Sequence, residues 1–233
     1  RVGERTWEFK EGFGKPQNYG LWLWPASVTL ANEINSLDLS QMSVLELGAG
    51  QGLVGMVAAT RGGIVTFCEK DPEVSVRLQT NLNNFKIENS VIFTGDWKDI
   101  IGSFDVILAS DVLYVPNGQI PLAETINRTW TGRGPCFVCD VRNRDKFSEA
   151  LTSYGLAFTK RELRGKLATG KEYANDLWEI KRNGKQDISQ STISKALILI
   201  NRLSPGDVLA MSAAVYSLHR AHPGRYLTAV DTT

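Results

Sequence analysis

Short apolar runs alternate with stretches of helical periodicity along most of the chain. Five runs of aliphatic or β-branched residues predict strands at 42–47, 64–68, 91–94, 104–109 and 135–141. Around them, apolar residues recur at helical spacing and predict helices at 26–37, 53–60, 72–84, 122–130 and 144–154. Strands that alternate with helices of this length indicate parallel β-α-β units, so we expect an α/β fold with a mostly parallel sheet.

Two more strand-like stretches, 156–162 and 176–182, follow without a helix long enough for a crossover between them. They are therefore expected to pair as an antiparallel hairpin at the end of the sheet. The full prediction is a Rossmann-like seven-stranded sheet, mostly parallel with an antiparallel C-terminal hairpin, in a domain of residues 1–182. Standard dinucleotide-binding folds lack such a hairpin.

The hydrophobic pattern restarts after a polar stretch at 183–194, which we interpret as a linker. A strand at 196–200, a helix at 208–220 and a strand at 226–230 predict one further β-α-β unit. A lone unit cannot bury both faces of its sheet, so we expect residues 195–233 to be the truncated opening of a second domain.

The strand-to-helix junction at residues 44–55 has the sequence VLELGAGQGLVG and is the most informative stretch. Its glycines let the backbone turn sharply beside a helix N-terminus, where free N–H groups can meet a ligand. Gly50, Gly52 and Gly55 match the dinucleotide fingerprint G-x-G-x-x-G. The first glycine after the strand is Gly48, however, and in that register a leucine occupies the place of the third glycine.

Glu46 favours a different ligand for this loop. Just inside the strand end, it would repel a pyrophosphate but attract the ammonium and sulfonium groups of S-adenosylmethionine. We therefore expect S-adenosylmethionine as the cofactor. NAD is the alternative, and a tight turn without a ligand is the third interpretation.

Polar residues also follow the next two strands. Glu69 follows the second strand and can accept hydrogen bonds from both ribose hydroxyls, a role for which Asp71 is the second candidate. Asp96 and Trp97 follow the third strand, where the carboxylate can accept from an adenine amino group and the indole can pack on the base. The alternative is that Asp96 caps a helix and Trp97 lies in the core.

The fourth strand ends in the motif Asp111-Val-Leu-Tyr114. Ligands of open α/β sheets bind beyond the carboxyl ends of the strands, so Asp111 and Tyr114 are expected to face a methyl acceptor. If the acceptor is lysine, its ammonium, with an unperturbed pKa of about 10.4, must lose a proton. Asp111 can then hold the nitrogen, and Tyr114 can orient it or receive the proton. Trp22 and Trp24 are expected to form a lid or wall over the cofactor, with burial in the core as the alternative.

Composition limits the partners. A net charge of +1 gives no basic field for nucleic acid, and no apolar run reaches the roughly 18 residues of a membrane span. The odd number of cysteines, three, argues against a disulfide framework. Cys136 and Cys139 are predicted to face opposite sides of one strand. We interpret them as core cysteines of a protein in a reducing compartment. We expect a monomeric cytoplasmic protein without a metal.

Together these motifs resemble the seven-stranded protein lysine methyltransferases, which methylate chaperones, elongation factors and other proteins. The resemblance spans about residues 7–181 and rests on Trp24-Pro25, the 46–55 loop, Glu69, Asp96-Trp97 and Asp111 to Tyr114. It implies Asp111 and Tyr114 as catalytic residues. It also implies a set of cofactor contacts: Trp24, Glu46, Gly48, Gly50, Gly52, Glu69, Asp96, Trp97 and Ala109.

Two positions depart from the pattern of this family. Gln51 stands where threonine is usual and Glu69 where aspartate is usual, and both keep the capacity to form hydrogen bonds. The activity implied is methyl transfer from S-adenosylmethionine to a protein side chain, with lysine the first expectation. A small-molecule N- or O-methyltransferase on the same scaffold and a non-catalytic cofactor-binding module are the alternatives.

The tail carries a second resemblance. Leu197 to Ile200, Ser204 to Val208 and Ala221 to Gly224 are similar to the start of a heptosyltransferase-like glycosyltransferase with two Rossmann domains. The resemblance implies that Asp207 lies on the acceptor side. The half that would bind a sugar nucleotide is absent from this sequence, so we expect no glycosyl transfer by this chain.

Overall fold

The computed structural model describes residues 1–12, 19–141, 145–166, 170 and 172–182. They contain seven strands: β1 (Ser43–Leu47), β2 (Ile64–Glu69), β3 (Ser90–Thr94), β4 (Val106–Ser110), β5 (Cys136–Asp140), β6 (Leu156–Lys166) and β7 (Glu172–Arg182). The α-helices among them are α1 (Pro25–Ile34), α2 (Leu53–Thr60), α3 (Pro72–Phe85), α4 (Gln119–Thr129) and α5 (Asp145–Ser153). Three short 3₁₀ helices complete the described elements: η1 (Tyr19–Leu21), η2 (Trp97–Asp99) and η3 (Pro116–Gly118).

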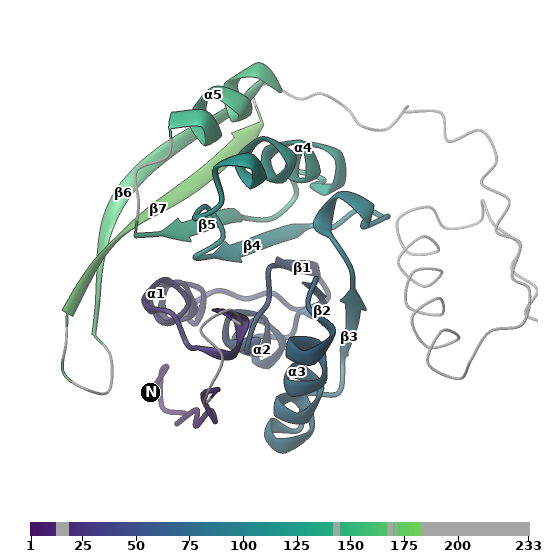
Figure 1. Ribbon diagram of the computed structural model, residues 1–233, viewed down its shortest axis with the longest axis vertical. Helices are drawn as coiled ribbons and strands as arrows, with labels where there is room; N and C mark the ends of the chain where they lie inside the picture. The colour runs from purple at the N-terminus through teal and green to yellow at the C-terminus, as the bar shows by residue number, and fades with distance from the viewer. Residues whose placement is uncertain (13–18, 142–144, 167–169, 171, 183–233) are drawn as a thin grey trace, which may run out of the picture.

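The strands form one sheet in the order β3-β2-β1-β4-β5-β7-β6. Strands β1 to β5 run parallel to one another, and β7 runs antiparallel to both of its neighbours. Figure 1 shows the long β6–β7 hairpin curving away at one end of the sheet. The predicted fold class and the antiparallel hairpin are therefore confirmed.

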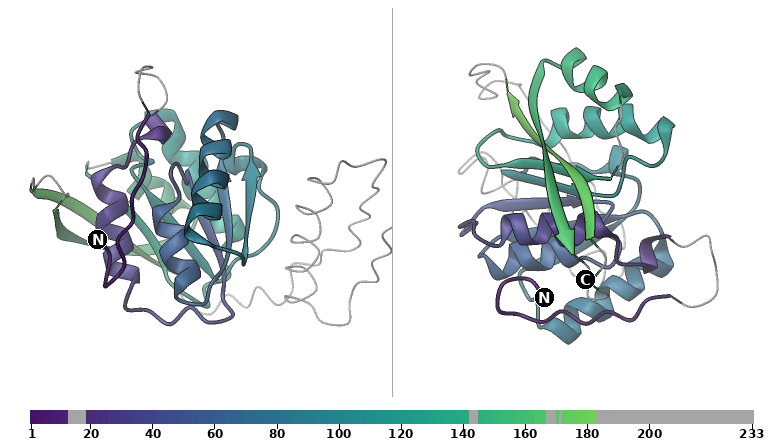
Figure 2. Two further views of the ribbon diagram at one scale, coloured as in Figure 1. Left: turned by 90° about the horizontal axis from the view of Figure 1, so that it is seen from below. Right: turned by 90° about the vertical axis from the view of Figure 1, so that its left-hand side faces the viewer.

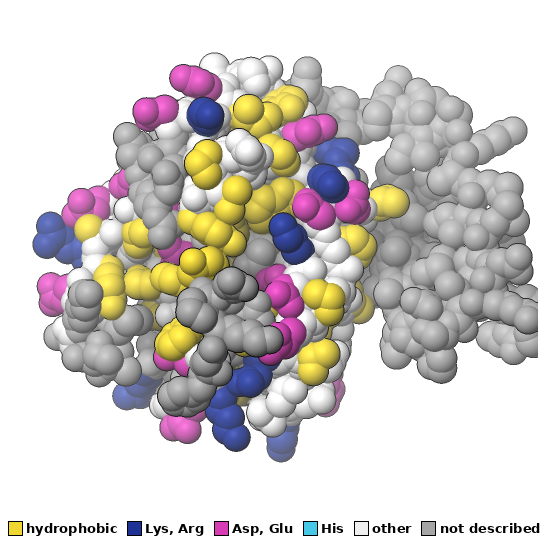
Figure 3. Space-filling view, viewed as in Figure 1, with side chains coloured by type: hydrophobic (Ala, Val, Ile, Leu, Met, Phe, Trp, Pro, Cys, Tyr) yellow, Lys and Arg dark blue, Asp and Glu magenta, His cyan; other side chains and the backbone are white. Residues whose placement is uncertain are grey.

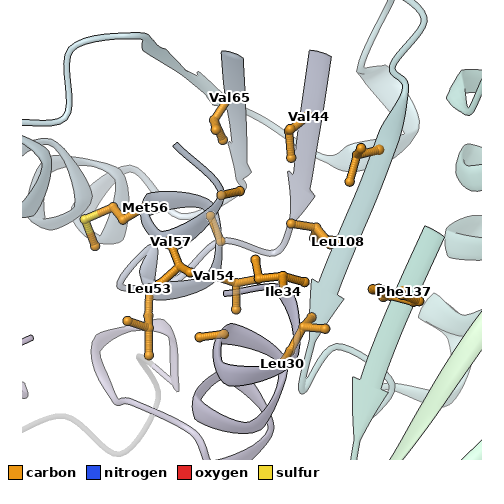
Figure 4. Packing of buried hydrophobic residues seen from close by; sticks show 14 of the residues in the cluster. Leu30, Ile34, Val44, Leu53, Val54, Met56, Val57, Val65, Leu108 and Phe137 are labelled. Carbon is orange, nitrogen blue, oxygen red and sulfur yellow. The ribbon is translucent and has the colours of Figure 1, made fainter. Parts of the chain in front are cut away.

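Helices cover both faces of this sheet, with α1, α2 and α3 on one side and α4 and α5 on the other (Figures 1 and 2). Successive residues of a strand point to opposite faces, so Val44 packs in the cluster under α1 and α2, whereas Leu45 packs in the cluster under α4 and α5. Figure 4 shows the first cluster, in which Leu30 and Val54 lie against the strands. The core clusters on both faces thus hold the central parallel strands in place.

The cysteines follow the same alternation. Cys139 belongs to the cluster under α1 and α2, Cys136 to the cluster under α4 and α5, and all three cysteines are free and buried. Burial raises the pKa of the Cys68 thiol to about 12, so this thiol stays protonated and unreactive at neutral pH. The interpretation as core cysteines is confirmed.

Some element boundaries differ from the predictions. Helix α1 ends at Ile34 rather than at 37, and α4 begins at Gln119 rather than at 122. Strand β6 continues to Lys166 because its backbone pairs with β7 as far as Glu172, although the side chains there are mostly polar. A strand that extends beyond the core has no apolar alternation to reveal its end.

Two further predictions concern the parts of the chain outside the core. The linker at 183–194 and the β-α-β unit at 195–233 lie outside the described residues.

Among the helices that the structure does describe, none combines the length and the apolar character that crossing a membrane requires. The same residues contain no group of three or more histidine, cysteine, aspartate or glutamate side chains suited to holding a metal ion.

Candidate functional site

The carboxyl ends of neighbouring parallel strands bring the predicted site residues to one edge of the sheet. Leu47 at the end of β1 is paired with Cys68 of β2 on one side and with Ala109 of β4 on the other. Glu69, the last residue of β2, is paired with Thr94 at the end of β3. The segments that follow these strands are therefore adjacent, as the sequence predicted.

The glycine turn at Gly48, Gly50 and Gly52 joins β1 to α2. All three glycines have positive φ angles, of 68°, 54° and 82°, in the left-handed region that favours glycine. A Cβ atom at Gly48 would lie 2.6 Å from Cγ1 of Val112, and one at Gly52 would lie 2.3 Å from Cδ1 of Leu78. The turn is thus packed directly against the segment that follows β4.

Glu46 supports this turn from inside the protein. Its carboxylate is buried, and Oε2 accepts a hydrogen bond of 2.9 Å from the amide of Gly55 in α2. Burial raises the pKa of Glu46 to about 8, the Gly55 hydrogen bond opposes that rise, and the charge of Glu69 adds to it. The side chain therefore braces the start of α2, and its contact with a cofactor stays a prediction.

Glu69 links the end of β2 to the same turn. Oε2 accepts a hydrogen bond from the amide of Gly50 at 2.8 Å, and Oε1 accepts one from the amide of Asp71 at 3.0 Å. Asp71 is the N-cap of α3, where its carboxylate accepts from the amide of Glu73. Of the two acids considered for the ribose, Asp71 is thus occupied at a helix end, and Glu69 lies against the glycine turn.

Asp96 and Trp97 make the contacts that the alternative interpretation predicted, a helix cap and core packing, and their role in binding adenine stays a prediction. Asp96 caps η2 by accepting a hydrogen bond of 3.1 Å from the amide of Lys98. The half-buried ring of Trp97 packs against the core cluster under α4 and α5. Its Cζ3 atom also lies 3.7 Å from the position of a Cβ at Gly48, so the indole reaches the glycine turn.

Asp111 occupies an unusual backbone conformation. Its φ angle is +53°, and its buried carboxylate accepts a hydrogen bond of 3.0 Å from the amide of Ala26 in the first turn of α1. A carboxylate at a helix N-terminus interacts favourably with the helix dipole. One carboxylate oxygen expected to face the acceptor is thus engaged by the protein itself, and it ties the end of β4 to the Trp24-Pro25 segment.

Tyr114 belongs to a set of aromatic side chains at this edge. Its ring meets that of Tyr19 edge-on with 5.9 Å between centroids, and Tyr19 lies 6.1 Å from Trp24. The indole Nε1 of Trp24 donates to the carbonyl of Tyr19 at 2.8 Å. Because Trp22 is exposed and Trp24 is half-buried, the alternative in which both lie in the core is wrong.

Two supporting residues, Tyr19 and Asp140, escaped the sequence analysis. Tyr19 belongs to no motif and carries no local signal. Asp140 is fully buried at the end of β5, and its Oδ2 accepts from the amide of Leu113 at 3.0 Å. It follows an apolar strand as Glu69 does, so the same rule would have found it.

Gln51 had been noted only as a departure from the usual threonine. Its Nε2 donates to the carbonyls of Lys10, at 3.1 Å, and Leu21, at 2.7 Å. Its Oε1 accepts from Asn81 of α3 at 2.8 Å. The glycine turn is thereby fastened to the N-terminal segment and to α3 through one side chain.

These groups fit a nucleoside with a cationic amino-acid end. Oε2 of Glu69 contacts the amide of Gly50, and the Trp97 ring lies close to Gly48. Three carboxylates, those of Glu69, Asp96 and Asp111, lie at or just after the ends of β2, β3 and β4. Carboxylates accept from hydroxyl and ammonium groups, whereas a pyrophosphate would meet like charge. This set of hydrogen-bond acceptors thus suits S-adenosylmethionine better than a dinucleotide.

Comparison with known proteins agrees with this chemistry. The chain is 34% identical over 129 residues to a histidine protein methyltransferase 1 homolog from Dictyostelium discoideum, which covers 51% of this chain and 42% of that protein. It is 31% identical over 120 residues to the protein N-lysine methyltransferase METTL21A of Danio rerio, which covers 47% of this chain and 55% of that protein. The match thus spans about half the length of these curated relatives.

A solved structure shares the fold. Magnesium protoporphyrin IX methyltransferase from Synechocystis PCC 6803, solved with bound S-adenosylmethionine, has a TM-score of 0.55 at 15% identity, over 66% of this chain and 76% of that one. This similarity shows the methyltransferase fold alone. Residues 5–153 match the family model described as lysine methyltransferase. The chain therefore belongs to the lysine methyltransferase family.

Proposed function

We propose that this chain transfers a methyl group from S-adenosylmethionine to a protein side chain, with lysine as the acceptor residue. The observation that carries the proposal is the contact between the glycine turn and the acceptor motif: a Cβ at Gly48 would collide with Val112, which lies between Asp111 and Tyr114. A cofactor held by the turn would therefore present its methyl group beside that motif.

The cofactor would be held by residues at the ends of strands β1, β2, β3 and β4, together with Trp24. We assign the ribose hydroxyls to Glu69, the adenine to Trp97 and Asp96, and the amino-acid end to the backbone of the turn from Gly48 to Gly52, with Trp24 and Ala109 alongside. When bound, S-adenosylmethionine supplies a methyl group activated by its sulfonium, and the transfer breaks a carbon–sulfur bond as a nitrogen–carbon bond forms. The chain contributes alignment and a water-poor surrounding.

The acceptor motif would divide two tasks between its ends. Asp111, anchored on Ala26, fixes the loop after β4 and places a negative charge beside the incoming amine. Tyr114, whose side chain is 48% exposed, is the end of the motif that reaches solvent and can contact the amine nitrogen. Loss of the ammonium proton must precede transfer, because only the neutral amine has a lone pair for the displacement.

The relatives support a protein acceptor more strongly than a particular residue. One is named a histidine protein methyltransferase and another a protein N-lysine methyltransferase. A small-molecule acceptor and a non-catalytic module are the competing proposals.

We further propose that the protein is a monomer located in the cytoplasm, a reducing compartment consistent with its free cysteines. The glycosyltransferase-like assignment of residues 195–233 rests on its sequence resemblance alone.

The decisive experiment supplies labelled S-adenosylmethionine to the purified chain with cell extract separated into protein and small-molecule fractions. Label in a protein band, at a lysine found by mass spectrometry, supports the proposal, whereas label only in small molecules contradicts it. Tyr114→Phe keeps the ring and removes the hydroxyl, so it should slow transfer while S-adenosylhomocysteine still binds in calorimetry. Intact binding without transfer to either fraction would favour the non-catalytic module.

A further inference from the structure

Tyr19 lies beside the acceptor motif although it belongs to none of the sequence motifs. Its side chain is 52% exposed, that of Tyr114 is 48% exposed, and the two rings meet edge-on with 5.9 Å between their centroids. A ring pair whose role was internal packing would be covered, yet about half of each side chain remains in contact with solvent. Figure 3 shows hydrophobic side chains gathered in a band across the face that it draws.

The position of Tyr19 is fixed by its backbone. Its carbonyl accepts from Nε1 of Trp24 at 2.8 Å and from the amide of Trp22 at 3.2 Å. The turn that carries it, η1, is tied at Leu21 to Gln51 of the glycine loop by a hydrogen bond of 2.7 Å. The backbone of Tyr19 is therefore tied to the glycine turn, and its ring is oriented by its contacts with Trp24 and Tyr114.

We propose that Tyr19 and Tyr114 form an aromatic wall that binds the cationic side chain of the acceptor protein before methyl transfer, an inference that rests on the proposed function. Aromatic faces attract ammonium, guanidinium and imidazolium groups through their quadrupole. The buried carboxylate of Asp111, three residues before Tyr114, adds negative charge behind the wall. A neutral acceptor would gain only apolar contact with the rings, and an anionic one would meet like charge.

The wall would act on binding rather than on the displacement itself. A cation over a partly exposed ring gains a modest free energy, which corresponds to about two- to fivefold in affinity. Because the pair stabilises the ammonium form, it recruits the side chain, and the ammonium then gives its proton to solvent water before the displacement. Tyr19 is thus a positioning residue, and its loss should raise KM while kcat changes less.

The test uses two probes of the same shape on the whole chain saturated with S-adenosylhomocysteine. One is N-acetyl-trimethyllysine amide, and the other is its neutral isostere, in which carbon replaces the charged nitrogen. With tyrosine rings labelled for NMR, the cationic probe should shift the signals of Tyr19 and Tyr114, and the isostere should bind at least twofold more weakly. Tyr19→Phe should keep the preference, and Tyr19→Leu should reduce it, because only the ring of Tyr114 remains.

Tyr154→Leu is the control, because it removes a tyrosine ring just after α5, where it packs against the cluster under α4 and α5, and leaves the Tyr19–Tyr114 pair intact. Equal shifts with both probes, an unchanged preference in Tyr19→Leu or an equal loss in Tyr154→Leu would overturn the proposal. Titration of the chain with S-adenosylhomocysteine, before either probe is added, separates this failure from failure of the proposed function. If S-adenosylhomocysteine does not bind, the function fails and the wall falls with it; if it binds without a cation preference, only the wall is wrong.

Discussion

The carboxylate of Asp111 accepts a hydrogen bond from the amide of Ala26 across 85 residues of sequence. This bond joins the loop after β4, which carries the acceptor motif, to the first turn of α1, which follows the Trp24-Pro25 segment. The two segments that carry Tyr114 and Trp24 are thereby held together from beneath. Substitutions at Asp111 should consequently affect folding as well as transfer.

We expect Asp111→Ala to lower the free energy of unfolding by about 1–3 kcal/mol, because the buried amide of Ala26 loses its acceptor. Asp111→Asn keeps an oxygen acceptor and tolerates a φ of +53°, so it should lose only about 0.5–1 kcal/mol of charge–dipole interaction. Urea unfolding of the two variants measures the difference. Equal losses would show that the bond to α1 contributes little.

Gly48→Ala should destabilise the protein through two separable effects. A φ of +68° strains any side chain, and the added Cβ would lie 2.6 Å from Val112. Gly155→Ala is the matched control, since its φ is +71° and nothing lies within 4 Å of the Cβ position. We expect about 1–2 kcal/mol from strain in both variants and about 1–3 kcal/mol more from crowding at Gly48. Similar melting temperatures for both would contradict the packed turn.

Glu46 should make stability depend on pH. Its pKa is about 8 in the folded protein against a reference of 4.5, so between these values the folded state holds a proton that the unfolded state releases. The free energy of unfolding should therefore fall as pH rises through this window, by at most about 1.4 kcal/mol per pH unit. Glu46→Gln should remove this slope.

Thermal unfolding at pH 5, 6.5 and 8 measures the slope in both proteins. Glu124→Gln, which changes an exposed carboxylate on α4, serves as the control and should leave the dependence intact. Parallel curves for the parent protein and Glu46→Gln would mean that Glu46 is ionised in the folded state at all three values.

Gln51→Glu should loosen the N-terminal segment. The substitution keeps an acceptor for Asn81 and removes the two N–H bonds to the carbonyls of Lys10 and Leu21. Hydrogen exchange at the amides of Gly12 and Trp22 should then quicken by tenfold or more, since a lost bond costs about 1–3 kcal/mol. Gln79→Glu, on the exposed side of α3, is the control, and equal exchange in both variants would contradict the role given to Gln51.

Local patterns predicted the sheet because each buried strand is a short apolar run and each covering helix repeats at 3.6 residues. They also placed Glu69 and Asp111 at strand ends. They did not reveal the hydrogen-bond partners of these carboxylates, because both partners are distant in sequence: Asp111 accepts from the amide of Ala26, and Glu69 accepts from the amide of Gly50. Tyr19 was missed for the same reason, because its ring contacts that of Tyr114, which is far away in the sequence.

The position of β7 between β5 and β6 constrains the order in which the chain can fold. Strand β6 is made first but pairs in the sheet with β7, so it has no place there until the chain has been synthesised as far as Arg182. Until then β5 is an open edge, and an unpaired strand edge invites association with other chains. A nascent protein of this topology therefore depends on β7 for protection against aggregation, even though the residues that we assign to cofactor and acceptor are complete far earlier.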